Sequence, residues 1–327
     1  MDGLEDLFAT AQQWLFETLM QPAMFALGLG HLLEDGYAAA GWLLVGLVQI
    51  LVLVAVIGPL QKWKPVEPVT DRVAVRTDIL YTLIHRLGVF RVALFFLVEP
   101  WFDALFGVLH VAGYTPFQLD QLWPGFTDAP WLAFALYLVV FDFADYWIHR
   151  AQHSLEWWWG LHSLHHSQRQ MTMWSDNRNH LLDDLLRDSL LVLLAQVIGV
   201  APGQFVAIVA ITQLSESLQH ANLKLWFGRV GERLWISPRF HRLHHSIGIG
   251  HESGDARPVM PQGRSPALGG HNFGVLLPWW DMLFRTANFE QRYDPTGVRD
   301  QVEKGRDYGR GFWSQQWLGV KRLFGKA

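Results

Sequence analysis

Three short histidine clusters are the residues of this chain whose types and spacing are best suited to chemistry. They read HRAQH from 149, HSLHH from 162 and HRLHH from 241. On a helix, residues three or four apart share a face, so each cluster would present its imidazoles together. Imidazole is the commonest metal ligand in proteins. Eight such residues exceed the needs of one ion, so the spacing predicts two metals, bound by His149, His153, His162, His165, His166, His241, His244 and His245.

Isolated histidines require a different interpretation. A single histidine on an apolar helix is usually a hydrogen-bonded core residue, and we expect this of His31, His85, His110 and His251. The clusters differ because neutral imidazoles packed side by side leave many ring nitrogens without partners. Each unpaired buried polar group costs about 1–3 kcal/mol. A divalent ion removes that cost by accepting the nitrogen lone pairs.

The residue types that are missing narrow the kind of metal site. The chain has no cysteine, which excludes disulfides, a catalytic thiol and thiolate-bound zinc. It also lacks the HExxH motif of many zinc hydrolases and the ExxH motif of soluble di-iron bundles. An all-imidazole site for two metals beside membrane helices fits another class of oxygen-activating iron enzyme. Imidazole also binds zinc and copper, so the ligand type leaves the ion open.

The composition indicates that membrane helices position these clusters. Of the 327 residues 50% are hydrophobic and only 17% are charged, which is unusual for a soluble protein. The 17 tryptophans agree with this interpretation, because tryptophan gathers at membrane interfaces. A net charge of −4 and a pI near 6.4 give no reason to expect nucleic acid as a partner.

The clearest membrane signal is the uncharged run from Tyr37 to Leu60. A bilayer-spanning helix needs about 20 apolar residues, and this run is long enough. A basic flank follows it at once. Because basic residues favour the cytoplasmic side, we expect this end of the span to face the cytoplasm, through Lys62, Lys64, Arg72 and Arg76.

Other apolar runs connect this span to the histidine clusters. Residues 77–110 are hydrophobic but carry several charges, which favours a helical hairpin or a partly buried span. The run 131–141 leads directly into the first cluster, so a helix starting near Ala129 would carry that cluster at its end. The run 190–212 contains Pro202-Gly203 and predicts a kinked helix or a re-entrant pair. No strand-like alternation persists, so we expect an all-α protein.

The segments outside these runs are of a different kind. Residues 248–270 are rich in glycine, proline and serine, which predicts a loop and a candidate lid. From Asn288 onward the chain is polar and mixed in charge, with Trp313 and Trp317 as expected anchors. The acidic N-terminus does not predict a secretory signal. We therefore expect N-terminal membrane helices over 1–130, a catalytic domain over 131–286 and a polar tail over 287–327.

The motifs DYWIHRAQH, WWWGLHSLHHS and SPRFHRLHHS, followed by NFGVLLPWWDMLF, resemble the fatty acid hydroxylase/sterol desaturase superfamily over about residues 131–286. The resemblance implies an integral-membrane helical bundle whose cytosol-facing, histidine-rich cap holds two ferrous ions. It also implies an oxidoreductase that uses O₂ to hydroxylate or desaturate a lipid. The substrate would be a fatty acyl, sterol or alkyl-ether chain.

The same resemblance extends the expected ligand set. The eight cluster histidines would be catalytic metal ligands. His220 stands where the family often has a further ligand, and His180 lies in an element similar to the family's Arg-x-His-Pro-x-Glu, with Leu181 and Asp183 at the Pro and Glu positions. His271 lies beside the point where the family has an Asp. It would either be a hydrogen-bond partner of a metal ligand or an ordinary loop histidine.

Carboxylates near the clusters are candidates for orienting the ligands. A metal-bound imidazole usually donates its second N–H to a carboxylate or carbonyl. The alternative for each is a salt bridge with Arg150, Arg178 or Arg187. We expect the run 157–159, three tryptophans, to be an interfacial anchor or core rather than a substrate clamp. The candidate carboxylates are Asp142, Asp145, Asp183, Asp184 and Glu216.

These inferences favour a membrane-bound di-iron lipid hydroxylase or desaturase that uses O₂. No flavin- or dinucleotide-type GxGxxG motif occurs, so electrons would come from an external reductase, ferredoxin or cytochrome. The alternative is a membrane zinc-binding protein or hydrolase without redox chemistry, and a third interpretation is a metal-free scaffold.

Overall fold

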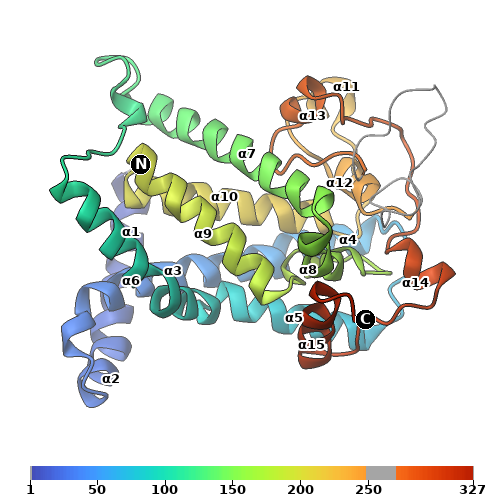
Figure 1. Cartoon of the computed structure of the whole chain (residues 1–327), viewed down its shortest axis with the longest axis horizontal. Helices are drawn as coiled ribbons and strands as arrows, with labels where there is room; N and C mark the ends of the chain where they lie inside the picture. The colour runs from blue at the N-terminus through green and yellow to red at the C-terminus, as the bar shows by residue number, and fades with distance from the viewer. Residues whose placement is uncertain (1, 248–269, 327) are drawn as a thin grey trace.

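Long helices running side by side form the body of the protein, and shorter helices gather at one end (Figure 1). The computed structural model describes residues 2–247 and 270–326, and within these ranges no β-strand occurs, so the all-α prediction is confirmed. The long helices are α3 (Leu33–Val52), α6 (Val89–Val111), α7 (Pro130–Ser154), α9 (Leu181–Ile198) and α10 (Pro202–His220). The cap at one end includes α8 (Glu156–His166), α12 (Pro238–His244), α13 (Trp279–Leu283), α14 (Arg299–Glu303) and α15 (Phe312–Leu323).

Three helical stretches of the described chain are long and apolar enough to cross a membrane: Gly30–Trp63, Val89–Val111 and Pro130–Ser154. The first contains α3 and α4 (Gly58–Trp63), joined by a π-helical turn at Leu53–Ile57. It includes the whole predicted run 37–60, and α7 begins one residue after the predicted start. The chain is therefore a membrane protein.

Two ambiguous segments are resolved by their helix boundaries. Residues 77–110 divide between α5 (Arg72–Arg86) and α6, which meet at Gly88, a residue with φ of 80°; only α6 is a candidate span. The run 190–212 divides between α9 and α10. Gly199, with φ of 67°, ends α9, and Pro202 lies in the first turn of α10, where proline fits best. Of the two alternatives predicted for this run, the single kinked helix was wrong, because the run is divided between a pair of helices.

A buried arginine ties three of these elements together. Arg86, at the end of α5, donates hydrogen bonds to the Gln49 side chain on α3, to Asp176 and to the Gln213 carbonyl on α10. The contact with Asp176 is 2.9 Å, and both side chains are almost fully buried. Its pairing compensates for the removal of both charges from water.

The C-terminal region packs on the helix that carries the second histidine cluster. The Arg322 side chain of α15 donates to the Gly160 carbonyl of α8 at 3.1 Å. Trp313 and Trp317 are exposed, at 80% and 61%. The division into three parts at 130 and 286 stays a prediction. Of the predicted loop and candidate lid at 248–270, residues 248–269, with His251, lie outside the described residues.

Candidate metal centre

Nine buried histidines converge in the cap, each placed by the end of a helix. His149 and His153 lie in the last turns of α7, and the second cluster occupies α8. His220 is the last residue of α10. The third cluster lies on and just after α12, a helix that starts at Pro238 and is capped by the Ser237 hydroxyl, which accepts the Phe240 N–H.

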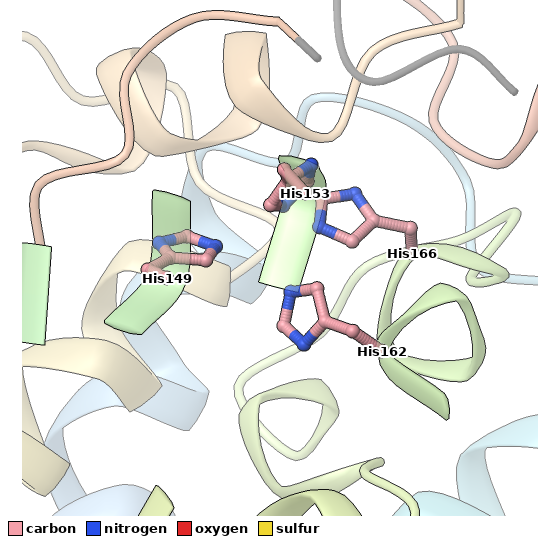
Figure 2. Close-up of side chains that lie close together, drawn as sticks. All are labelled: His149, His153, His162 and His166. Carbon is pink, nitrogen blue, oxygen red and sulfur yellow. The ribbon is translucent and has the colours of Figure 1, made fainter. Parts of the chain in front are cut away.

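The first group of imidazoles comprises His149, His153, His162 and His166. One ring nitrogen from each lies within 4.8 Å of those of the other three, and the rings face a common space (Figure 2). In five of the six ring pairs the centroids are 4.6 to 5.3 Å apart. All four side chains are buried. Four nitrogens at this spacing can share one metal ion.

The second group comprises His165, His220, His241 and His245. The Nε2 atom of His220 lies 3.1 Å from those of His165 and His241, and the Nε2 atoms of His241 and His245 are also 3.1 Å apart. An imidazole nitrogen lies about 2.1 Å from a divalent metal ion that it binds. Two such nitrogens that make a right angle at the ion are therefore about 3.0 Å apart. The second group therefore has the nitrogen spacing of ligands around one ion.

The two groups adjoin each other through His166 and His245, whose rings stack at 4.2 Å. These two also form a third set of converging nitrogens with His244. The His244 ring lies 4.6 Å from that of His149 and 4.7 Å from that of His153. The arrangement suits a pair of neighbouring ions rather than two distant sites.

Backbone carbonyls fix the orientation of three rings. The Nδ1–H of His149 donates to the Phe273 carbonyl (2.8 Å). In the same way, His244 donates to the His271 carbonyl (2.7 Å) and His220 to the Glu216 carbonyl (2.8 Å). A carbonyl only accepts, so Nδ1 carries the proton and Nε2 presents the lone pair that a metal needs.

Asp183 performs this role for His162. Its Oδ2 accepts the Nδ1–H of His162 at 2.9 Å, while Oδ1 accepts Gln152 Nε2 at 2.7 Å and Trp158 Nε1 at 2.6 Å. Of the five candidate carboxylates, only Asp183 touches an imidazole of the two groups.

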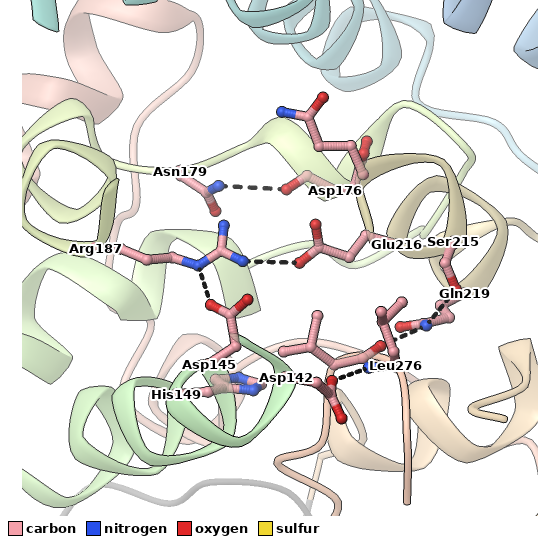
Figure 3. Close-up of polar contacts among 12 residues, drawn as sticks. Asp142, Asp145, His149, Asp176, Asn179, Arg187, Ser215, Glu216, Gln219 and Leu276 are labelled. Carbon is pink, nitrogen blue, oxygen red and sulfur yellow. Dashed lines mark hydrogen bonds and ion pairs between the residues drawn. The ribbon is translucent and has the colours of Figure 1, made fainter. Parts of the chain in front are cut away.

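The other four carboxylates bind elsewhere, and Figure 3 shows three of them, Asp142, Asp145 and Glu216. Asp145 forms a 3.0 Å ion pair with Arg187, which also lies 3.6 Å from Glu216. Asp142 accepts the backbone N–H groups of Leu276 and Leu277 and the indole of Trp280, and Asp184 lies 3.3 Å from His85 Nε2. The salt-bridge alternative thus describes Asp145 and Glu216.

The loop that supplies two of the orienting carbonyls was not foreseen from the sequence. Asp281 accepts the N–H groups of Phe273 (2.9 Å) and Gly274 (2.8 Å). Asn272 adopts φ of 60°, and its amide donates to the Phe240 carbonyl. These bonds fold the loop so that the carbonyls of His271 and Phe273 point at ligands. The contribution of His271 that the structure shows is therefore its backbone carbonyl.

His180 is a correction to the expected ligand set. Its Nε2 lies 2.8 Å from the Gln316 carbonyl, and its Nδ1 accepts the Leu182 N–H at 3.2 Å. Both ring nitrogens are thus engaged by the chain, and His180 is absent from the converging groups. It caps the start of α9 and joins it to α15.

The chemistry of the cluster fits a metal. Burial and the neighbouring imidazoles hold the pKa values of His165, His166, His241 and His245 well below the ordinary value of 6.5, so these rings are neutral and can bind metal at neutral pH. The Nε2 atoms of His149, His162 and His166 are buried without a hydrogen-bond partner. A bound ion would satisfy them.

Comparison with known proteins agrees with this geometry. The Fatty acid hydroxylase family model matches residues 134–286. The chain is 28% identical to ornithine lipid hydroxylase OlsE of Rhizobium tropici over 264 residues, covering 79% of this chain and 72% of that protein. It is 26% identical to alkylglycerol monooxygenase of Caenorhabditis elegans over 171 residues, covering 51% of this chain and 29% of that protein. No solved structure matches the chain significantly.

The family and these relatives indicate a lipid hydroxylase or monooxygenase, and so an oxidoreductase. The histidine groups indicate that it uses a metal. The matched segment contains all three clusters and His220. Over residues 134–286 the chain is thus similar to the fatty acid hydroxylase family, in agreement with the resemblance that the three histidine motifs carry.

Proposed function

We propose that this protein is a di-iron, O₂-dependent hydroxylase of a membrane lipid with a long acyl or alkyl chain. The observation that carries the proposal is the convergence of two adjoining groups of four buried imidazoles. One iron would be held by His149, His153, His162 and His166, and the other by His165, His220, His241 and His245. His244 would lie between them, and His180 is left out.

We prefer iron to zinc because the two relatives are named as a hydroxylase and a monooxygenase. Imidazole alone does not distinguish these ions. A hydroxylase and a monooxygenase both insert oxygen, whereas zinc has no redox chemistry. When bound, two ferrous ions supply the electrons and binding positions that O₂ activation needs.

The residues of the chain orient the ligands and exclude water. Carbonyl and carboxylate partners keep the ring protons on Nδ1 of His149, His162 and His220. All nine imidazoles are less than 9% exposed, which protects a reactive site from side reactions with water.

A small cavity between α6, α7, α9 and α10 suggests how a lipid approaches. Apolar side chains such as Phe141, Leu191 and Ile208 line it together with charged ones. Two of these, Asp145 and Glu216, lie one turn before His149 and His220. Its volume of about 60 Å³ is that of about two water molecules. We propose that these helices separate to admit the acyl or alkyl chain of the lipid.

We place the metal centre on the cytoplasmic side of the membrane. The basic flank of the first span lies beside the cap, since the Lys224 N–H donates to the Lys64 carbonyl and the Asn222 amide to the Glu67 carbonyl. Basic flanks favour the cytoplasm. The electron donor would then be a cytoplasmic reductase, ferredoxin or cytochrome.

The experiment measures metal content and lipid products of protein expressed with iron and purified without O₂. His165→Ala, from the second group, is expected to lose most of the iron and nearly all hydroxylated lipid in host extracts. His110→Ala is the matched control and should retain both, because His110 lies outside the groups and is exposed rather than in the core as predicted. Zinc in place of iron, or a His165→Ala protein with full iron and turnover, would refute the assignment.

A further inference from the structure

A basic hollow lies on the surface of the cap beside α15. It has a volume of about 420 Å³ and is lined by Lys304, Arg306, Asp307, Leu318, Lys321 and Lys326. Arg306 also lies 2.9 Å from the buried carboxylate of Asp300. Counting both carboxylates, cations still outnumber anions by two in this small area, although the whole chain carries a net charge of −4.

Exposed aromatic side chains lie on α15, the helix that supplies Leu318 and Lys321 to the hollow. Trp313 and Trp317 lie one turn apart on α15 and are 80% and 61% exposed. The Lys321 ammonium lies 5.7 Å from the Trp317 ring. Exposed tryptophans beside cations are typical of a surface that binds a partner.

Beneath this surface, buried aromatic rings lead to the metal centre. Tyr308 follows Asp307 in the chain, and the Arg322 guanidinium lies 4.4 Å above its ring. Tyr308 packs with Trp159 and Val298 in one buried cluster. The Trp159 ring is 5.2 Å from that of His153 and 5.4 Å from that of His166. Tyr308 and Trp159 thus join the hollow to two proposed ligands.

A glycine allows this close approach. A side-chain carbon at Gly160 on α8 would lie 3.3 Å from the Arg322 backbone of α15, tighter than most contacts of this kind. The Gly160 carbonyl also accepts the Arg322 guanidinium at 3.1 Å. The surface that carries the hollow is therefore held firmly against the helix of the second histidine cluster.

We propose that this surface docks an acidic one-electron carrier protein, and that Tyr308 and Trp159 form the path of its electrons to the metals. The inference rests on the proposed function. Hydroxylation inserts one oxygen atom of O₂ into a C–H bond and reduces the other to water, which consumes two electrons and two protons. The carrier, an iron–sulfur or haem protein, is oxidised by one electron in each of two encounters.

The internal aromatic path is what favours a protein over the bilayer as the occupant. Anionic lipids also attract lysine and tryptophan. A lipid headgroup, however, has no use for a ring path to His153 and His166. An acidic carrier protein benefits from the basic surface as well as from the rings. Its opposite charge speeds the encounter, and the rings shorten the distance that its electrons cross to the metals.

The test mixes oxidised, iron-loaded protein in detergent with reduced plant-type [2Fe–2S] ferredoxin without O₂, and follows the oxidation of the ferredoxin. The double variant Lys321→Gln, Lys326→Gln is expected to lower the second-order rate constant about tenfold at low ionic strength. The difference should vanish in about 0.5 M salt. Lys224→Gln, which removes an exposed charge elsewhere on the cap, should match the wild type.

The path is tested separately at saturating ferredoxin. Tyr308→Leu removes the ring and should slow electron transfer, whereas Tyr308→Phe keeps the ring, loses the hydrogen bond to Asp300 and should remain near the wild-type rate. Dithionite, a small reductant that needs no docking, should reduce all variants equally. Equal rates for Tyr308→Leu and Tyr308→Phe would refute the path.

One further result overturns the docking proposal, namely an unchanged ferredoxin rate in the double lysine variant. If that variant also loses binding to phosphatidylglycerol vesicles, the surface is a lipid contact. Failure of the proposed function shows differently, because dithionite-reduced wild-type protein would then hydroxylate no lipid on exposure to O₂.

Discussion

Single atoms that never touch a metal determine which ring nitrogens face the cluster. The carbonyls of Phe273 and His271 and the carboxylate of Asp183 each accept an Nδ1–H. Asp183 is the most heavily used of these, since it also accepts from Gln152 and Trp158. A residue of this kind acts by positioning a ligand, and its removal should weaken metal binding without removing a ligand.

We expect Asp183→Asn to weaken metal affinity by about 10- to 100-fold, the usual effect of losing such a partner. The amide keeps the volume of the carboxylate, but only one of its two terminal atoms is an oxygen that accepts hydrogen bonds. Dialysis against graded chelator, followed by iron determination, measures the change. Asp35→Asn, at an exposed position, serves as the control. Equal retention of iron by the two variants would contradict the role of Asp183.

At the level of the elements, close helix crossings and buried ion pairs hold the ligand-bearing helices in register. Arg187 of α9 bridges Asp145 of α7 and Glu216 of α10, one turn before a ligand on each. Arg86 fastens α5 to α3 and α10. Where α3 crosses the end of α5, an added side-chain carbon at Gly46 would lie 1.6 Å from the Arg86 carbonyl oxygen.

Gly46→Ala is therefore expected to destabilise the protein by at least about 1–3 kcal/mol, the usual cost of overpacking, because the backbone of α5 has to move. Gly107→Ala on α6 is the matched control. Nothing lies within 4 Å of its added carbon, and alanine improves helix propensity by about 1 kcal/mol. Thermal unfolding in detergent should show a lower Tm for Gly46→Ala only. Equal Tm values would count against this crossing.

The sequence predicts the elements well and their mutual contacts poorly. The apolar run 131–141 was sufficient to place α7 and its histidines. Helical spacing was sufficient to recognise the three clusters, but it did not show that the second is divided between the two groups. The role of His180 depends on the Gln316 carbonyl, 136 positions away, which no local pattern reveals. The carbonyls of the 270–274 loop are equally invisible, because every residue has one and only the fold selects which point at a ligand.

For the molecule as a whole, the metal centre and the basic flank of the first span lie at one end, and the turn before α7 lies at the other (Figure 1). This arrangement makes the orientation testable, because the chain has no cysteine of its own. Any introduced thiol is therefore a unique label.

With the cap in the cytoplasm, Lys224→Cys should resist a membrane-impermeant thiol reagent in intact cells and react after permeabilisation. Asp128→Cys, exposed just before α7, should react in intact cells. Both substitutions alter exposed side chains, so folding is expected to be preserved, and iron content verifies it. The reverse labelling pattern would place the metal centre on the opposite side of the membrane.

The central claim is that this metal centre inserts an oxygen atom from O₂ into a lipid. The most direct measurement supplies isotopically heavy O₂ to membranes containing the wild-type protein and a reductant, followed by mass spectrometry of the lipids. The account predicts a lipid that gains one heavy oxygen atom, and none with His165→Ala or His244→Ala protein. A product whose new oxygen comes from water, or no oxidised lipid while about two iron ions per chain are bound, would contradict it.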